Sequence, residues 1–147
     1  MANYESDLHL TVSTLSNALK ASIKETMRTQ KTLSSPLYFI ILKGIYENEH
    51  CTAQDLTEIT FKDKGQIARL VKELIFNEII AKEVNPSDKR SQFLCLTETG
   101  FQYYLQLKAV DDVAINIMRS GISDKELDTF IKLGKKMSHN LSSINTK

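Results

Sequence analysis

Basic and amide side chains gather in two short stretches of this 147-residue chain. In the first, residues 62–72, a turn of 100° per residue places the polar side chains opposite the apolar Ile67, Val71 and Leu74. A guanidinium can bond guanine or phosphate, an amide can bond adenine, and a lysine can bond phosphate. The stretch therefore predicts a helix that contacts nucleic acid. Its candidate contact residues are Lys62, Lys64, Gly65, Gln66, Ala68, Arg69 and Lys72.

The second stretch is the turn at residues 87–90, which lies between two β-capable runs. Adjacent cations on an exposed turn could bind phosphates or enter a narrow minor groove, which attracts arginine. An acidic residue beside them does not suit a polyanion, so we interpret Asp88 as a structural partner that orients Arg90 or another arginine. A plain solvated surface is the alternative interpretation of both stretches. The candidate contact residues of this turn are Ser87, Asp88, Lys89 and Arg90.

The cysteines and histidines show no comparable pattern. Cys51 and Cys95 lack C-x-x-C spacing, and we expect both to be reduced core residues in short strands. A lowered thiol pKa is the alternative for Cys51, because it lies just before a predicted helix. A zinc site shared across a dimer is a further alternative, and it would draw on Glu5, His9 or His139.

Motifs of enzymes are missing from the sequence. It contains no G-x-S-x-G, no glycine loop that could hold a phosphate and no Cys with a plausible His partner. We therefore expect no enzymatic activity, no catalytic residues, no cofactor and no metal.

Composition narrows the class of protein further. The net charge is +1, from 19 basic and 18 acidic residues, which excludes a bulk polycation but leaves room for a local basic surface. Hydrophobic residues make up 41% of the chain, too many for a disordered protein. No apolar run approaches the roughly 20 residues of a membrane span, and the first residues lack the pattern of a secretory signal. We expect a mainly helical, cytoplasmic protein without a membrane partner.

Long helices are predicted at both ends of the chain. Residues 5–30 carry apolar side chains at spacings of three and four, which indicates one amphipathic helix. Such a helix is about 39 Å long, so we expect part of its apolar stripe to meet a second copy of the chain. Another helix is predicted at 98–119, ended by Gly121 in the C′ position. The box Ser123-Asp-Lys-Glu126 opens a last helix, whose stripe runs to Ile144.

The middle of the chain has the order of a helix-turn-helix followed by a β-hairpin. Capping residues precede each apolar periodic run, and the period then changes from helical to alternating. The predicted fold class is therefore mainly α with a small β-hairpin wing, a winged helix-turn-helix with N- and C-terminal dimerisation helices. The predicted middle elements are helices at 37–47, after Thr52 and at 63–77, and strands at 79–84 and 91–97.

Three motifs of this middle region resemble the MarR family of bacterial transcription regulators. They are Asp63-Lys-Gly-Gln-Ile-Ala-Arg-Leu-Val-Lys-Glu-Leu74, Asn85-Pro-Ser-Asp-Lys-Arg90 and Leu96-Thr-Glu-Thr-Gly100. The Asp-Lys-Arg wing followed by Leu-Thr-x-x-Gly is the most specific part, and the order of elements matches along nearly the whole chain.

The resemblance implies one MarR-like unit over residues 1–147. Its winged helix-turn-helix would occupy about 35–97, and its dimerisation helices about 5–33 and 98–144. The unit would act as a homodimer on a pseudo-palindromic operator in double-stranded DNA. Members of the family often respond to small aromatic or phenolic effectors, which bind between the dimerisation helices and the winged helix-turn-helix. Here such a pocket, or alternatively plain core, would be formed by Tyr38, Tyr46, Tyr103 and Tyr104.

The chain departs from the family pattern at three places. Asn77-Glu78 replaces the usual Lys-Gly before the first wing strand, so we expect another turn geometry there. Ala68 stands where many members carry a DNA-contacting threonine, which puts shared base preferences in doubt. No cysteine precedes Cys51, so the oxidant-sensing mechanism of one branch is disfavoured.

The leading hypothesis is a sequence-specific DNA-binding transcriptional regulator that acts as a ligand-responsive homodimeric repressor. One alternative keeps the DNA site but activates transcription or binds without an effector. The other is a winged-helix protein-interaction module or adaptor that does not bind DNA.

Overall fold

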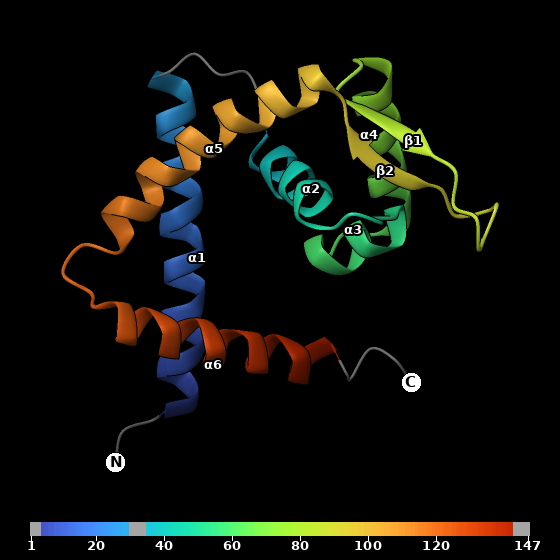
Figure 1. The fold of residues 1–147 in the computed structure, drawn as a ribbon. Helices are drawn as coiled ribbons and strands as arrows, with labels where there is room; N and C mark the ends of the chain where they lie inside the picture. Colours follow the sequence, from blue (N-terminus) through green and yellow to red (C-terminus); the bar gives the residue numbers. More distant parts are fainter. Residues whose placement is uncertain (1–3, 30–34, 143–147) are drawn as a thin grey trace.

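The computed structural model describes residues 4–29 and 35–142, in which six helices flank one two-stranded antiparallel hairpin (Figure 1). The predicted order of elements and the predicted fold class are confirmed. The helices are α1 (Tyr4–Thr29), α2 (Pro36–Glu47), α3 (Ala53–Thr60), α4 (Lys64–Phe76), α5 (Glu98–Met118) and α6 (Asp124–Ser142), and the strands are β1 (Ile80–Glu83) and β2 (Phe93–Leu96).

Polar caps set the starts of the helices, because the first N–H groups of a helix have no partner within it. At α3, Asp55 N–H donates to the Thr52 hydroxyl at 3.3 Å, and Thr52 N–H donates to the Asp55 carboxylate at 2.7 Å. At α4, Gln66 N–H donates to the Asp63 carboxylate at 2.9 Å. Three further side chains accept hydrogen bonds at the starts of their helices: Ser35, Thr97 and Ser123.

Helix α2 forms the centre of the core. It is apolar on nearly all sides, and both Ile41 and Leu42 are 0% exposed. Helices α1, α3 and α5 and strand β2 pack around it. The core also buries Leu56 of α3 and Leu107 of α5. A single hydrophobic core thus holds the helix-turn-helix, the hairpin and the first part of α5 in one unit.

Gly100 explains the glycine of the Leu-Thr-x-x-Gly motif. A Cβ atom at this position would lie 1.8 Å from the carbonyl oxygen of Ile79. The Thr97 hydroxyl caps α5 and also donates to the carbonyl of Glu78 at 2.6 Å. The start of α5 is therefore packed backbone against backbone on the start of the hairpin.

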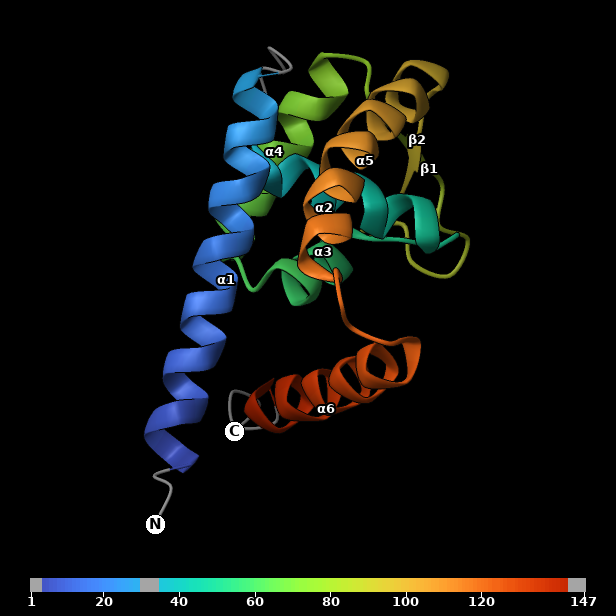
Figure 2. The same ribbon diagram turned by 90° about the vertical axis from the view of Figure 1, so that its left-hand side faces the viewer.

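The two ends of the chain bury much less surface. The end of α1 reaches the core through Met27, which is 6% exposed, but its first half leaves Leu8, Leu10 and Val12 about half exposed or more. None of the described residues of α6 is buried. Figure 2 shows α6 below α2 to α5, at the level of the first half of α1, reached through a short turn after α5.

Three local expectations need correction. Glu78 takes the left-handed conformation (φ 57°) that a glycine favours, so the replacement of Lys-Gly has not removed that geometry. Helix α5 ends with Arg119 as its C-cap, and Gly121 (φ 75°) is the second residue after it rather than the C′ residue. Cys51 lies outside a strand, although its carbonyl accepts the Leu94 N–H at 2.7 Å. Ile144 lies outside the described residues.

Candidate nucleic-acid interface

Helix α4 has one buried side and one exposed side. Ile67, Val71 and Leu74 are 1%, 6% and 2% exposed and anchor the helix on the core. All but one of the predicted contact residues of this segment are exposed, and Gln66 is half-buried. We call this set the recognition face: Lys62, Lys64, Gly65, Gln66, Ala68, Arg69 and Lys72.

The turn between α3 and α4 contains an aromatic residue that sequence reasoning missed. Phe61 caps the end of α3 in a left-handed conformation (φ 53°), and its side chain is 68% exposed. The Thr60 hydroxyl accepts the N–H of Lys62 at 3.3 Å and closes the turn. An apolar periodicity cannot reveal such a residue, because it faces solvent at a helix end. Its ring lies next to the recognition face in the chain.

Strands β1 and β2 pair from Ile80 with Leu96 to Glu83 with Phe93, and they carry a loop that projects away from the core beside α4 (Figure 1). We call residues 87–90 of this loop the wing tip. All four of its residues are exposed. The recognition face and the wing tip thus belong to adjacent elements of one rigid module, away from the first half of α1.

Side-chain bonds to the backbone shape the wing loop. The Asn85 side chain, 8% exposed, accepts the N–H groups of Ser87 at 3.0 Å and Asp88 at 3.2 Å. Asp88 in turn accepts the backbone N–H of Arg90 at 2.9 Å. Asp88 is therefore structural, as predicted, but it orients Arg90 through its backbone rather than its guanidinium. The sequence placed Asn85 in this turn but not its hydrogen bonds, although Asn before Pro is a common turn signal.

The cations of the two surfaces are unpaired within the described part of the chain. The ion pairs there lie on α1, α2, α5, α6 and the α5–α6 turn, for example between Lys108 and Asp112 at 2.6 Å. None of them involves Arg69, Lys72 or Arg90. These cations are thus available to an outside anion.

The four predicted pocket tyrosines lie in two pairs, Tyr46 with Tyr104 and Tyr38 with Tyr103. Tyr104 is 3% exposed and stacks on Phe39, with ring centroids 5.9 Å apart. Tyr46 also stacks on Tyr104, with ring centroids 4.9 Å apart, and it lines an open cleft. Tyr38 donates its hydroxyl to the Glu73 carboxylate of α4, and burial raises the pKa of this phenol to about 12. Tyr103 is half-buried near Tyr38.

The cysteines are core residues. Cys51 is 1% exposed, and burial followed by the charge of Asp55 raises the pKa of its thiol to about 11. The alternative of a lowered pKa is wrong, because desolvation penalises the thiolate. Cys95 lies in β2 as predicted, and its thiol pKa is raised mainly by burial. Within residues 4–29 and 35–142, no three His, Cys, Asp or Glu side chains form a group that could hold a metal ion.

No helix of the described chain is both long enough and apolar enough to cross a bilayer.

Known proteins are similar to this chain in sequence and in fold. Residues 34–91, which include the helix-turn-helix and the wing tip, match the MarR family. The chain is 27% identical over 120 residues to the HTH-type transcriptional regulator YkoM of Bacillus subtilis (strain 168), covering 81% of this chain and 78% of YkoM.

Two solved structures share the fold along nearly the whole chain. A MarR family transcriptional regulator from Silicibacter pomeroyi superposes with a TM-score of 0.79 at 19% identity, covering 95% of this chain and 94% of that one. CouR from Rhodococcus jostii RHA1, solved with bound p-coumaroyl-CoA, gives a TM-score of 0.78 at 19% identity over 94% and 96% of the two chains. The winged helix-turn-helix of this chain is thus similar to the MarR family over residues 34–91, and its fold is that of solved MarR family regulators along nearly the whole chain.

Proposed function

We propose that this regulator binds double-stranded DNA as a homodimer, with α4 in the major groove and the wing tip on the flanking backbone or minor groove. The observation that carries the proposal is the two-sided character of α4. Its apolar side is fixed in the core, while Arg69 and Lys72 are exposed and unpaired within the described chain. The small residues Gly65 and Ala68 of the recognition face leave room for close approach to the base edges.

The wing supports the same mode of binding. The Asn85 side chain holds two N–H groups of the loop, so the backbone of the wing tip is ordered before any ligand arrives. Lys89 and Arg90 then project from a fixed turn. A preformed turn loses less conformational entropy on binding than a flexible one.

The homodimer is proposed from the apolar surface at the two ends of the chain. On α6, Phe130, Met137 and Leu141 lie on one face and are 40–67% exposed. On α1, Leu8 and Val12 are about half exposed. Burying such surfaces is favourable by about 25 cal/mol per Å². A second copy of the chain offers the matching surfaces and would set the two α4 helices about 34–36 Å apart, the spacing of successive major grooves.

We further propose that an aromatic effector releases the DNA, which makes the protein a repressor. CouR, which has a similar fold, was solved with bound p-coumaroyl-CoA. In this chain the Tyr38–Glu73 hydrogen bond ties the start of α2 to α4. An effector that forms a hydrogen bond with Tyr38 or Glu73 in place of this one would favour another position of α4. The two α4 helices of the dimer would then shift toward a spacing that fits DNA poorly.

Selection of genomic duplex fragments by the purified protein, followed by affinity measurements on the selected fragment, tests the proposal. We expect the double variant Arg69→Ala/Arg90→Ala to lose at least about 10-fold in affinity at fixed salt, since each base or phosphate contact is worth about 1–3 kcal/mol. Equal affinity of the variant, or no selection above random duplex, would contradict DNA binding and favour the adaptor alternative.

A further inference from the structure

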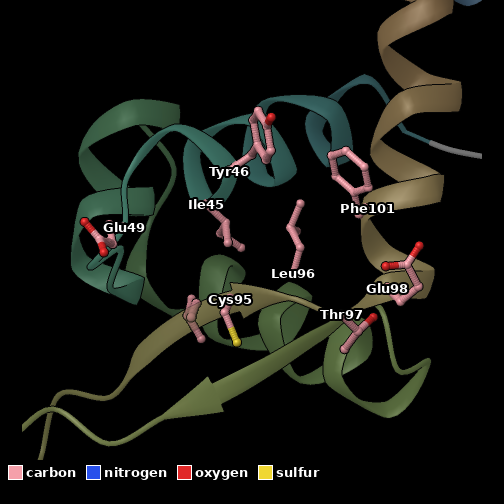
Figure 3. A pocket seen from close by; sticks show the side chains of 9 residues that line it. Ile45, Tyr46, Glu49, Cys95, Leu96, Thr97, Glu98 and Phe101 are labelled. Atoms are coloured by element: carbon pink, nitrogen blue, oxygen red, sulfur yellow. The ribbon is translucent and has the colours of Figure 1, made fainter.

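A cleft of about 330 Å³ opens between the end of α2, strand β2 and the start of α5 (Figure 3). No described residue of α1 or α6 lines it. It therefore lies apart from the apolar surfaces assigned above to the dimer, and apart from the Tyr38–Glu73 bond. Its volume falls in the lower part of the usual range for sites that bind small molecules.

Aromatic rings form one wall of this cleft. Figure 3 shows the side chains of Tyr46, Phe101 and Leu96 around the same space. The Tyr46 ring stacks on Phe101 at 5.6 Å and on the buried Tyr104 at 4.9 Å, yet 55% of Tyr46 is exposed. The ring is thus packed against two aromatic neighbours and still leaves surface exposed to a ligand. The lining also includes the buried Ile45, so the wall is both rigid and apolar.

The charged groups of the lining are all of one sign. Two carboxylates, Glu49 and Glu98, lie at opposite ends of the set in Figure 3, and no Lys, Arg or His lines the cleft. Glu98 accepts a bond from the Gln102 amide at 3.1 Å, but neither glutamate forms an ion pair within the described chain. Burial raises the thiol pKa of Cys95, so that lining residue stays neutral. The cleft therefore attracts cations and repels carboxylates.

We propose that this cleft binds a small organic cation with an apolar or aromatic body, such as a substituted amine or a quaternary ammonium ion. The ring face of Tyr46 would receive the cation through a cation–π contact. Glu49 and Glu98 would supply the opposite charge, and Leu96 with Ile45 would bury the apolar part. This chemistry is opposite in charge to that of an aromatic acid.

The position of the cleft links it to the wing, a consequence that depends on the DNA binding proposed above. Its lining includes Thr97, which joins β2 to α5 and bonds the Glu78 carbonyl at 2.6 Å. A ligand that prefers one angle between β2 and α5 would change DNA affinity, and DNA would change ligand affinity by the same factor.

Calorimetry on the full chain without DNA tests the site itself. The probe is benzyltrimethylammonium, compared with phenylacetate as an anion of similar size. We expect the cation to bind and phenylacetate not to bind. The double variant Glu49→Gln/Glu98→Gln should weaken cation binding roughly 10-fold, because it removes the two negative charges of the cleft. Both side chains are exposed, so the change leaves the core intact. The matched control Glu58→Gln removes an exposed carboxylate outside this cleft and should leave binding unchanged.

The aromatic contribution is tested by Tyr46→Ala, which should weaken cation binding roughly 10-fold, and by Tyr46→Phe, which keeps the ring and should retain it. Circular dichroism of each variant checks the fold. Equal binding of cation and phenylacetate, or cation binding that the glutamate variants do not change, would overturn the proposal. Because no DNA is present, this outcome is independent of whether the regulator binds an operator. With operator added, a changed DNA affinity in the presence of the cation would support the link to the wing, and an unchanged one would contradict that link alone.

Discussion

The winged-helix part of the molecule and its terminal helices bury their apolar side chains to very different extents. In α2, Ile41 and Leu42 are fully buried by contacts within the same chain. In α6, Phe130 and Leu133 are 55% and 50% exposed, and no described residue of that helix is buried. The first region is stabilised by its own core. The second has the sequence of an amphipathic helix whose apolar side is left exposed by the described residues of the chain.

The two regions should therefore respond differently to mutation. A change in the winged-helix core should lower the free energy of unfolding of each protomer. A change on the apolar face of α6 should alter association and leave the winged helix folded.

The largest effect is expected from Met137→Asp on the apolar face of α6. An unpaired charge buried at an interface opposes association by about 3–5 kcal/mol, so the dimer dissociation constant should rise more than 100-fold. Sedimentation velocity would show a folded monomer. Thr129→Asp, an exposed position elsewhere on the same helix, is the matched control and should remain dimeric. A Met137→Asp dimer as tight as the wild type would remove α6 from the interface.

Gly100→Ala should act on the other region. The added Cβ would lie 1.8 Å from the Ile79 carbonyl oxygen, a backbone atom that cannot rotate away. We expect a loss of about 1–3 kcal/mol in the free energy of unfolding, measured by urea denaturation at fixed protein concentration. Thr99→Ala, exposed on the same turn of α5, should change it little. Unchanged stability of Gly100→Ala would contradict the close packing of α5 on the hairpin.

Arg90→Ala should weaken DNA binding by about 1–3 kcal/mol without loss of the dimer, because the wing tip is distant from α6. Affinity for the selected duplex at matched salt, together with sedimentation, would check both parts. Lys24→Ala on α1 removes an exposed cation outside the winged helix and serves as the control. If the two variants bind equally well, Arg90 is not a DNA contact.

The smallest effect is expected from Glu78→Gly. Glu78 has a φ of 57°, a conformation that is unfavourable by about 1–2 kcal/mol for most L-residues and free for glycine. Part of this gain is lost to the greater entropy of glycine in the unfolded chain. We expect a net stabilisation of roughly 0.5–1 kcal/mol, visible as a small rise in Tm. A lower Tm would show that the Glu78 side chain stabilises the turn.

Local signals in the sequence were enough to predict the helices and the hairpin. Caps such as Thr52 and Asp63, and the apolar spacing of Ile67, Val71 and Leu74, depend only on neighbours in the chain. The same signals placed the recognition face, since a buried side defines its opposite side.

Features that depend on distant partners could not be predicted in this way. The bond from Tyr38 to Glu73 spans α2 and α4, and the stacking of Tyr46 on Tyr104 joins α2 to α5. Spacing along one helix does not reveal such pairs, so the four tyrosines were grouped without knowledge of which of them are in contact. Asp88 was expected to bond a guanidinium but bonds a backbone N–H, because the turn brings that group closer.

Hydroxyl-radical footprinting of the wild-type protein on the selected duplex tests the proposed DNA binding most directly. Two winged helices held by one dimer should protect two windows on the same side of the duplex, about one helical turn apart, and Met137→Asp should lose this paired pattern at the same protein concentration. A single protected window for the wild type, or no protection above that on random duplex, would contradict a dimer that reads DNA with two α4 helices.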